Sequence, residues 1–258
     1  MTDSDRPASP PPAPAGCALV VGVGGRVGIG AAVAKRFATE GLHVHIVGRT
    51  AAKLDEVVAN IVDAGGKASA IVNTLGSERE VAALFEALGS QALDAVVYNA
   101  AFKNVPRRFL TTPPAFIEDN WQLSCIAGLM VGQAALRRMQ PQGRGTLIVT
   151  GATASLRGKP AFAAFASAKA GLRSWTLALA REAAPLGIHV AHAVIDGVVA
   201  GDRVKETGGG LGRLLVASRG KDGALLPEQI ADNYWQLHAQ PRGAWTRELD
   251  LRPWKENF

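Results

Sequence analysis

Two kinds of hydrophobic pattern alternate along most of the chain. Short, almost continuous apolar runs are separated by longer segments in which apolar residues recur at helical spacing. Strands that alternate with helices in this way form a parallel sheet covered by helices on both faces, with right-handed crossovers, so the pattern predicts an α/β domain. The predicted strands are 18–21, 43–48, 67–72, 93–98, 145–150, 188–194 and a last strand after Trp245; the predicted helices are 31–40, 51–64, 78–88, one within 113–139, 162–185 and 226–240.

The turn between the first strand and the first helix is rich in glycine. Residues 22–30 contain five glycines in nine positions. Such a turn lets the backbone approach a pyrophosphate closely and presents free N–H groups at a helix N-terminus. The alternative is a plain strand-to-helix turn without a ligand, but the strand, loop, helix and second strand together favour a dinucleotide site. Its expected residues are Gly22, Gly24, Arg26, Gly28, Ile29 and Gly30.

The residue after the second strand indicates which dinucleotide is preferred. Arg49 stands where an acidic residue would bind the ribose hydroxyls of NAD. A cation at this position suits a 2′-phosphate, and Arg26 in the glycine loop is a second cation that can reach the same group. We therefore expect NADP(H), with NAD(H) as the alternative. Without a ligand, Arg49 would be a solvated residue at the start of a helix.

Composition limits the class of protein. With 258 residues and 48% hydrophobic content, the chain suffices for one domain, expected at 17–258 after a Pro-rich, disordered lead at 1–16. The lead has no apolar core of a secretory signal, and no apolar stretch is long enough to span a bilayer. Cys17 and Cys125 do not suggest a disulfide framework, so we expect a cytoplasmic protein with no membrane partner. The net charge of +6 is scattered, which favours anionic small molecules over nucleic acid, and the five histidines predict no metal site.

Several motifs together resemble the short-chain dehydrogenase/reductase superfamily over about residues 18–199. They are the glycine loop ending in Gly28–Gly30, the Asn99–Ala101 segment after the fourth strand, and Lys169 on a long helix. The resemblance implies a Rossmann-type three-layer fold with a doubly wound parallel sheet of about seven strands in the order 3-2-1-4-5-6-7. It also implies a small-molecule substrate, a homodimer or homotetramer paired through the Lys169 helix, and cofactor contacts near Asn99 and Ala100.

The active centre departs from the superfamily pattern. There, a serine, a tyrosine and a lysine act together, and counting back from Lys169 places Phe165 at the tyrosine position and Ala152 at the serine position. Phenylalanine cannot donate a proton, and an alanine side chain cannot make a hydrogen bond. Lys169 itself is expected to bind the nicotinamide ribose, because an ammonium group on so apolar a helix needs a partner; the alternative is an exposed helix residue.

Other residues are candidates for the missing chemistry. Thr153 is adjacent to the serine position, and Ser155 lies in the same segment. Tyr234 shares a helix face with His238, so the pair is a candidate proton source, with packing against the sheet as the alternative. The resemblance further implies cofactor contacts at Thr74 and Val198 and a water-holding role at Ser124, with packing within the helix as the alternative for the serine. The glycine-rich residues 201–223 indicate a mobile substrate lid at 200–226, with disorder without function as the alternative.

Two functions are consistent with this sequence. One is an NADP(H)-dependent oxidoreductase whose hydride transfer needs no tyrosine, for example onto a conjugated C=C bond. The other is an NADP-binding protein of the same fold that has lost turnover and acts as a sensor or as a partner in an assembly. The positions of Phe165 and Ala152 separate the two hypotheses.

Overall fold

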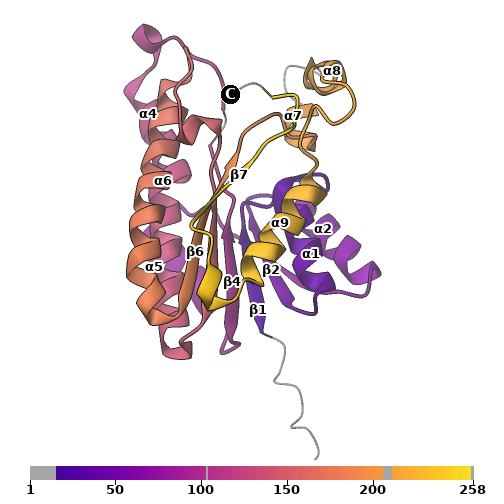
Figure 1. Ribbon diagram of the computed structural model, residues 1–258, viewed down its shortest axis with the longest axis vertical. Helices are drawn as coiled ribbons and strands as arrows, with labels where there is room; N and C mark the ends of the chain where they lie inside the picture. Colours follow the sequence, from indigo (N-terminus) through magenta and orange to yellow (C-terminus); the bar gives the residue numbers. More distant parts are fainter. Residues whose placement is uncertain (1–15, 103, 206–210, 257–258) are drawn as a thin grey trace, which may run out of the picture.

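The computed structural model describes residues 16–102, 104–205 and 211–256 of the chain. The predicted disordered lead lies outside this part except for residue 16, and so do residues 206–210 within the predicted lid. In the described ranges the elements are arranged in three layers, with a central sheet between two groups of helices (Figure 1).

The sheet confirms the predicted fold class and strand order. Seven strands in the described part of the chain pair in parallel in the order β3-β2-β1-β4-β5-β6-β7. The direction of strand addition reverses between β1 and β4, which is where open α/β sheets bind ligands. The strands are β1 Cys17–Val21, β2 His43–Gly48, β3 Lys67–Val72, β4 Leu93–Tyr98, β5 Gly145–Thr150, β6 Ile188–Ile195 and β7 Glu248–Leu251.

The helices divide between the two faces of the sheet. Helices α3, α5 and α6 contribute to one buried cluster, and α1, α2 and α9 contribute to the other (Figure 1). No helix in the described ranges is long and apolar enough to cross a membrane. The helices are α1 Ile29–Thr39, α2 Ala51–Asp63, α3 Glu78–Glu86, α4 Pro114–Trp121, α5 Ala127–Met139, α6 Ala163–Ala183, α7 Asp202–Lys205, α8 Leu211–Ser218 and α9 Pro227–His238.

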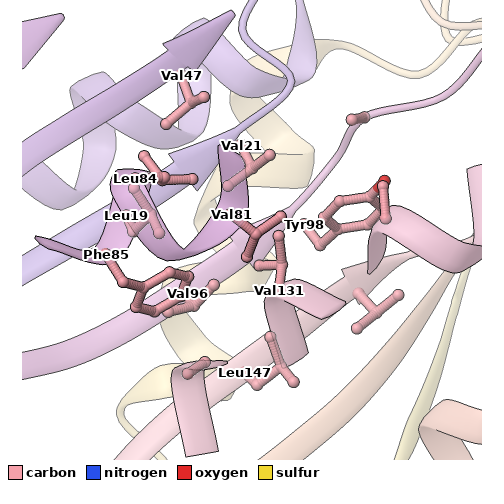
Figure 2. Close-up of a cluster of buried hydrophobic side chains, with 14 of the residues drawn as sticks. Leu19, Val21, Val47, Val81, Leu84, Phe85, Val96, Tyr98, Val131 and Leu147 are labelled. Carbon is pink, nitrogen blue, oxygen red and sulfur yellow. The ribbon is translucent and has the colours of Figure 1, made fainter. Parts of the chain in front are cut away.

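The alternation of side chains along the central strands builds both clusters. In β1, Leu19 and Val21 point to the α3/α5/α6 side, whereas the neighbouring residues point to the α1/α2/α9 side. Figure 2 shows the first cluster, in which Phe85 of α3 and Val131 of α5 pack over the strands near Tyr98 of β4. Tyr98 is fully buried and donates its hydroxyl hydrogen to the carbonyl oxygen of Leu123. This bond ties the end of β4 to the segment between α4 and α5.

That segment differs from the sequence-based expectation. The helix predicted within 113–139 is interrupted by a π-helical turn at Gln122–Ile126, between α4 and α5. Such turns insert an extra residue into a helix and are frequent at functional sites. Helices α7 and α8 were also not predicted, because the glycine-rich stretch around them reads as a loop.

Candidate functional site

The candidate site lies at the carboxyl edge of the sheet, at the top of the molecule in Figure 1. Because the strands are parallel, the segments that follow β1, β4, β5 and β6 all meet at this edge. The structure thus brings the glycine loop near Asn99, near the loop after β5 and near α7. These segments come from widely separated parts of the sequence.

The glycine loop has the shape that a phosphate group requires. A Cβ added at Gly24 or Gly28 would meet no atom within 4 Å, so the space above the loop is open. At Gly30, by contrast, a Cβ would lie 3.0 Å from the carbonyl oxygen of Gly22, because α1 packs closely against the end of β1. Open glycines over the loop and a packing glycine inside the helix are the division of roles found in dinucleotide-binding loops.

The loop is held by hydrogen bonds from its neighbours. The N–H groups of Gly22 and Val23 donate to the carbonyl oxygen of Val47 at 2.9 and 2.8 Å. Asn99 Nδ2 donates to the carbonyl oxygen of Gly22 at 3.1 Å. Gly22 has a φ of +92°, and a Cβ there would lie 2.4 Å from the backbone nitrogen of Ala100, so only glycine fits. Asn99 and Ala100 therefore shape the loop from the end of β4.

The two cations proposed for a 2′-phosphate flank α2. Arg49 is exposed and lies just before the helix begins at Ala51. Arg26 is exposed in the glycine loop, and its guanidinium lies 3.5 Å from Asn60 Oδ1 on the same helix. Both positive charges are therefore available to an anion at this end of the sheet.

Thr74 is already engaged within its own loop. Its hydroxyl donates to Glu80 Oε2 at 2.5 Å, and the N–H of Gly76 donates to the same oxygen at 2.8 Å. These two bonds stabilise the carboxylate and lower the pKa of Glu80. In any adenine contact the hydroxyl of Thr74 could therefore only accept a hydrogen bond, since its hydrogen is given to Glu80.

Lys169 is buried at the end of β5. Only 2% of the residue is exposed, which excludes the alternative of a solvated helix residue. Its Nζ donates to the carbonyl oxygen of Thr150 at 2.8 Å and lies 5.9 Å from the centre of the Phe165 ring. Phe165 therefore sits one helical turn from the lysine, as the i, i+4 spacing requires, and presents an apolar ring where a tyrosine would present a hydroxyl.

An ion cluster that the sequence did not predict joins the loop after β5 to the segments after β6 and β7. Thr153 Oγ1 donates to Asp196 Oδ1 at 2.5 Å. Asp196 is 1% exposed and pairs with Arg157 at 3.5 Å and with Arg252 at 3.0 Å. A buried carboxylate needs such partners to offset its lost hydration. The only signal in the sequence was a single acid at the end of an apolar strand.

A second polar network, built around the buried ring of His192, lies beneath the same loop. His192 Nδ1 is 3.0 Å from Glu248 Oε2, and Arg173 donates two hydrogen bonds to that carboxylate at 2.6 and 2.8 Å. Burial lowers the pKa of His192 to about 4, so the ring is neutral at pH 7. A Cβ at Gly151 would lie 2.2 Å from His192 Nε2 and 3.0 Å from Ser155 Oγ, so the loop passes close over both groups.

Ser155 lies in the turn that follows. Its Oγ accepts a hydrogen bond from the N–H of Ala152 at 3.1 Å. The hydroxyl hydrogen of Ser155 is not used by that bond, whereas Thr153 gives its hydrogen to Asp196. The side chain of Ser155 is buried beneath the loop. Two hydroxyl groups were predicted near the active centre, those of Thr153 and Ser155. In the observed bonds only Ser155 keeps a hydroxyl hydrogen that it can donate.

Tyr234 and His238 share a helix face, as the spacing predicts, and both contact β5. Tyr234 Oη lies 2.9 Å from Thr150 Oγ1, and His238 Nδ1 lies 3.0 Å from Thr146 Oγ1. Tyr234 is fully buried, and burial raises its pKa. It reaches Thr150 from the α9 side of the sheet, whereas Lys169 belongs to α6 on the other side. The structure therefore shows the packing alternative for this pair.

Ser124 and Val198 have backbone partners. Ser124 is buried in the π-helical turn, and its Oγ accepts a hydrogen bond from the N–H of Phe102 at 2.9 Å. The carbonyl oxygen of Val198 accepts a bond from the N–H of Leu225 at 2.8 Å. Ser124 thus fixes the chain after β4, and Val198 lies in a short paired segment that leads into α7.

An anionic side chain already contacts the glycine loop. Asp202 Oδ2 accepts a hydrogen bond from the N–H of Val27 at 2.8 Å. A carboxylate oxygen is chemically close to a phosphate oxygen as an acceptor, so this bond shows that the loop can present an N–H group to an anion. The open space over Gly24 and Gly28 and the cations Arg26 and Arg49 also fit a phosphate-bearing dinucleotide.

Comparison with known proteins identifies the family. The family description "short chain dehydrogenase" matches residues 17–211, and the chain belongs to that family of oxidoreductases. It is 32% identical to the short-chain reductase protein NovJ of Streptomyces niveus, over 83% of each chain. It is also 28% identical to a very-long-chain 3-oxoacyl-CoA reductase of Coccidioides immitis over 67% of this chain, but the match spans only 50% of that longer protein.

Solved structures agree with this assignment. A short-chain dehydrogenase from Rhodopseudomonas palustris is 37% identical, with a TM-score of 0.77, and the match covers 92% of this chain and 98% of the other. A metagenomic short-chain oxidoreductase in complex with NADP is 25% identical, with a TM-score of 0.78, and the match covers 92% and 97%. The family binds NAD(P), and the predicted superfamily membership is confirmed.

Proposed function

We propose that this protein is an NADP(H)-dependent oxidoreductase that acts on a small-molecule substrate without a catalytic tyrosine. The observation that carries the proposal is the open glycine loop at the N-terminus of α1, flanked by Arg26 and Arg49. Arginine side chains at this corner favour a 2′-phosphate over bare ribose hydroxyls. The NADP complex of the metagenomic relative supports the same choice of cofactor.

Different residues of the chain would bind different parts of the cofactor. The backbone N–H groups of the loop bind the pyrophosphate, and the two arginines bind the 2′-phosphate. Asn99 holds the loop in shape. Lys169 would bind the nicotinamide ribose, and the backbone near Val198 would bind the carboxamide. When bound, the cofactor supplies hydride-transfer chemistry.

The substrate class follows from what the active centre lacks. A general acid contributes roughly 100- to 10,000-fold to a rate, and one oxyanion donor roughly 100- to 1,000-fold. With Phe165 and Ala152 in place, an unactivated ketone would lose both contributions. A conjugated C=C bond makes smaller demands, because the proton goes to carbon and can come from water. Ser155 keeps a hydroxyl hydrogen for the substrate oxygen, but because its side chain is buried beneath the loop, the loop would have to move before it could donate.

A second candidate function is nucleotide binding without turnover. It is favoured by the hydroxyl of Thr153, which gives its hydrogen to Asp196 instead of offering it to a ligand. Under this alternative the protein would act as a sensor or as a partner in an assembly. In either case we propose a homodimer or homotetramer as the assembly.

Cofactor oxidation distinguishes the two candidates. The purified protein, saturated with NADPH, is mixed with a panel of ketones and conjugated enones while absorbance at the reduced-cofactor band is followed. We expect oxidation with at least one enone and slower or no oxidation with simple ketones. A Lys169→Met variant, which removes the ammonium group and keeps the apolar stem, should lose at least about 10-fold in rate. Binding of NADPH without oxidation by any compound of the panel would instead support the non-catalytic function.

A further inference from the structure

The first residue of α7 makes a two-way contact with the glycine loop. Asp202 Oδ2 accepts a hydrogen bond from the N–H of Val27 at 2.8 Å, and the N–H of Asp202 donates to the carbonyl oxygen of Val27 at 2.7 Å. The residues are separated by 175 positions in the sequence. Helix α7 is thus bonded to the loop through both a side chain and the backbone.

The contact places a negative charge directly against the loop. A Cβ added at Gly25 would lie 2.9 Å from Asp202 Oδ2, and a Cβ added at Gly201 would lie 3.1 Å from the carbonyl oxygen of Val27. The chain at 201–202 therefore presses against 25–28 with no room for a further group between them. The N–H of Val27, two residues before α1 begins at Ile29, already has an anionic acceptor.

A dinucleotide pyrophosphate needs the same environment. It requires backbone N–H groups at the start of a helix and a local field that favours negative charge. A carboxylate at this place occupies one of the N–H donors. It also adds a like charge within a few ångströms of a bound anion, which makes the binding free energy of that anion less favourable because charges near a protein surface are only partly screened. Two anions therefore compete for one loop.

We infer that Asp202 is an autoinhibitory residue whose carboxylate occupies part of the pyrophosphate position. The inference rests on the proposed function, since it concerns the same cofactor site. Binding of the cofactor requires the carboxylate to leave the N–H of Val27, so that cofactor binding and displacement of α7 are coupled. The free energy needed to displace the carboxylate makes the observed binding free energy of the cofactor less favourable, and so weakens its apparent affinity.

The test compares NADPH affinity in three forms of the full-length chain. Asp202→Asn keeps an acceptor for the N–H of Val27 and removes the charge, whereas Asp202→Ala removes both. Asp63→Asn makes the same charge change at the exposed last residue of α2 and serves as the matched control. Dissociation constants are measured by calorimetric titration, and thermal unfolding of each variant verifies that it is folded.

We expect Asp202→Asn to bind NADPH at least 10-fold more tightly than the wild type, Asp202→Ala to bind at least as tightly as Asp202→Asn, and Asp63→Asn to match the wild type. If the wild type binds NADPH and both Asp202 variants bind equally or more weakly, the inference is wrong while the proposed function stands. If the wild type and both folded Asp202 variants fail to bind NADPH or NADH, the proposed function itself is overturned.

Discussion

We propose that Phe165 occupies the position at which the family pattern has a tyrosine. Its ring lies one helical turn from Lys169, whose ammonium group is 5.9 Å from the ring centre. On this proposal the lysine is kept, while the side chain that would donate a proton is missing. Ala152 also lacks a polar side chain. Its backbone N–H donates a hydrogen bond to Ser155 Oγ, but its methyl group cannot make a hydrogen bond to a substrate. Activity on ketones should thus be limited by two side chains and not by the fold.

The double variant Phe165→Tyr, Ala152→Ser tests this account at the residue scale. It restores a phenolic donor four residues before Lys169 and a hydroxyl after β5. We expect ketone reduction with NADPH to rise at least about 100-fold over the wild type, the lower end of what a general acid contributes. Ala152→Ser alone is the control and should gain far less. An unchanged rate in a folded double variant that still binds NADPH would show that the active centre lies elsewhere.

The sequence alone indicates Lys169, the glycine loop and Asn99 as candidates, because each is tied to a strand end or to a fixed spacing. It does not indicate that Asp202 bonds to Val27 or that Thr153 bonds to Asp196, since those partners are 175 and 43 positions apart. Contacts over such distances depend on how the strands are ordered and on how loops pack, which no local pattern encodes.

Strands β6 and β7 are joined by a partly buried polar network as well as by their backbone ladder. His192 on β6 contacts Glu248 on β7, and Arg173 from α6 clamps the same carboxylate. The neutral imidazole is accommodated because its Nδ1 has a partner. Protonation would place a positive charge on the buried imidazole ring. Burial disfavours that charge and lowers the pKa of His192 to about 4.

This network predicts a loss of stability in mild acid. Between pH 6.5, the ordinary pKa of the unfolded residue, and about 4, its pKa in the folded protein, the unfolded state binds more protons than the folded state. Stability from His192 is therefore complete above pH 6.5 and is lost as the pH falls to about 4. The loss amounts to about 3 kcal/mol for a shift of this size.

Urea unfolding at pH 7 and pH 4.5 measures this effect. His192→Asn keeps an N–H donor for Glu248 but does not titrate, so it should lose much less stability between the two pH values than the wild type. His43→Asn is the control, because His43 is only half-buried and lies on β2, outside this network. Equal losses in the wild type and in His192→Asn would contradict the assignment.

Most elements could be predicted from the sequence, for identifiable reasons. Strands β2, β3, β4 and β5 begin and end at the predicted residues, because each is an apolar run bounded by polar or glycine residues. The π-helical turn could not be predicted, since its residues continue the helical pattern on both sides. Helix α8 was missed because neighbouring glycines outweighed its apolar spacing.

At the scale of the whole molecule, strand order and parallel pairing decide where the site lies. The order β3-β2-β1-β4-β5-β6-β7 brings the ends of β1 and β4 together, and the glycine loop, Asn99 and the loop after β5 then share one edge. Fold and site position therefore follow from the alternation of strands and helices together with the family motifs. The substrate does not, because the side chains that would recognise it are not tied to any such pattern.

The measurement that tests the account most directly is an equilibrium titration of the full-length wild type with NADPH and, separately, with NADH, by calorimetry at one fixed ionic strength. The account predicts saturable binding of one NADPH per chain, at least about 10-fold tighter than NADH because Arg26 and Arg49 contact the 2′-phosphate. Arg49→Glu should reduce or reverse this preference. Absence of saturable binding of either dinucleotide, or tighter binding of NADH by the wild type, would contradict it.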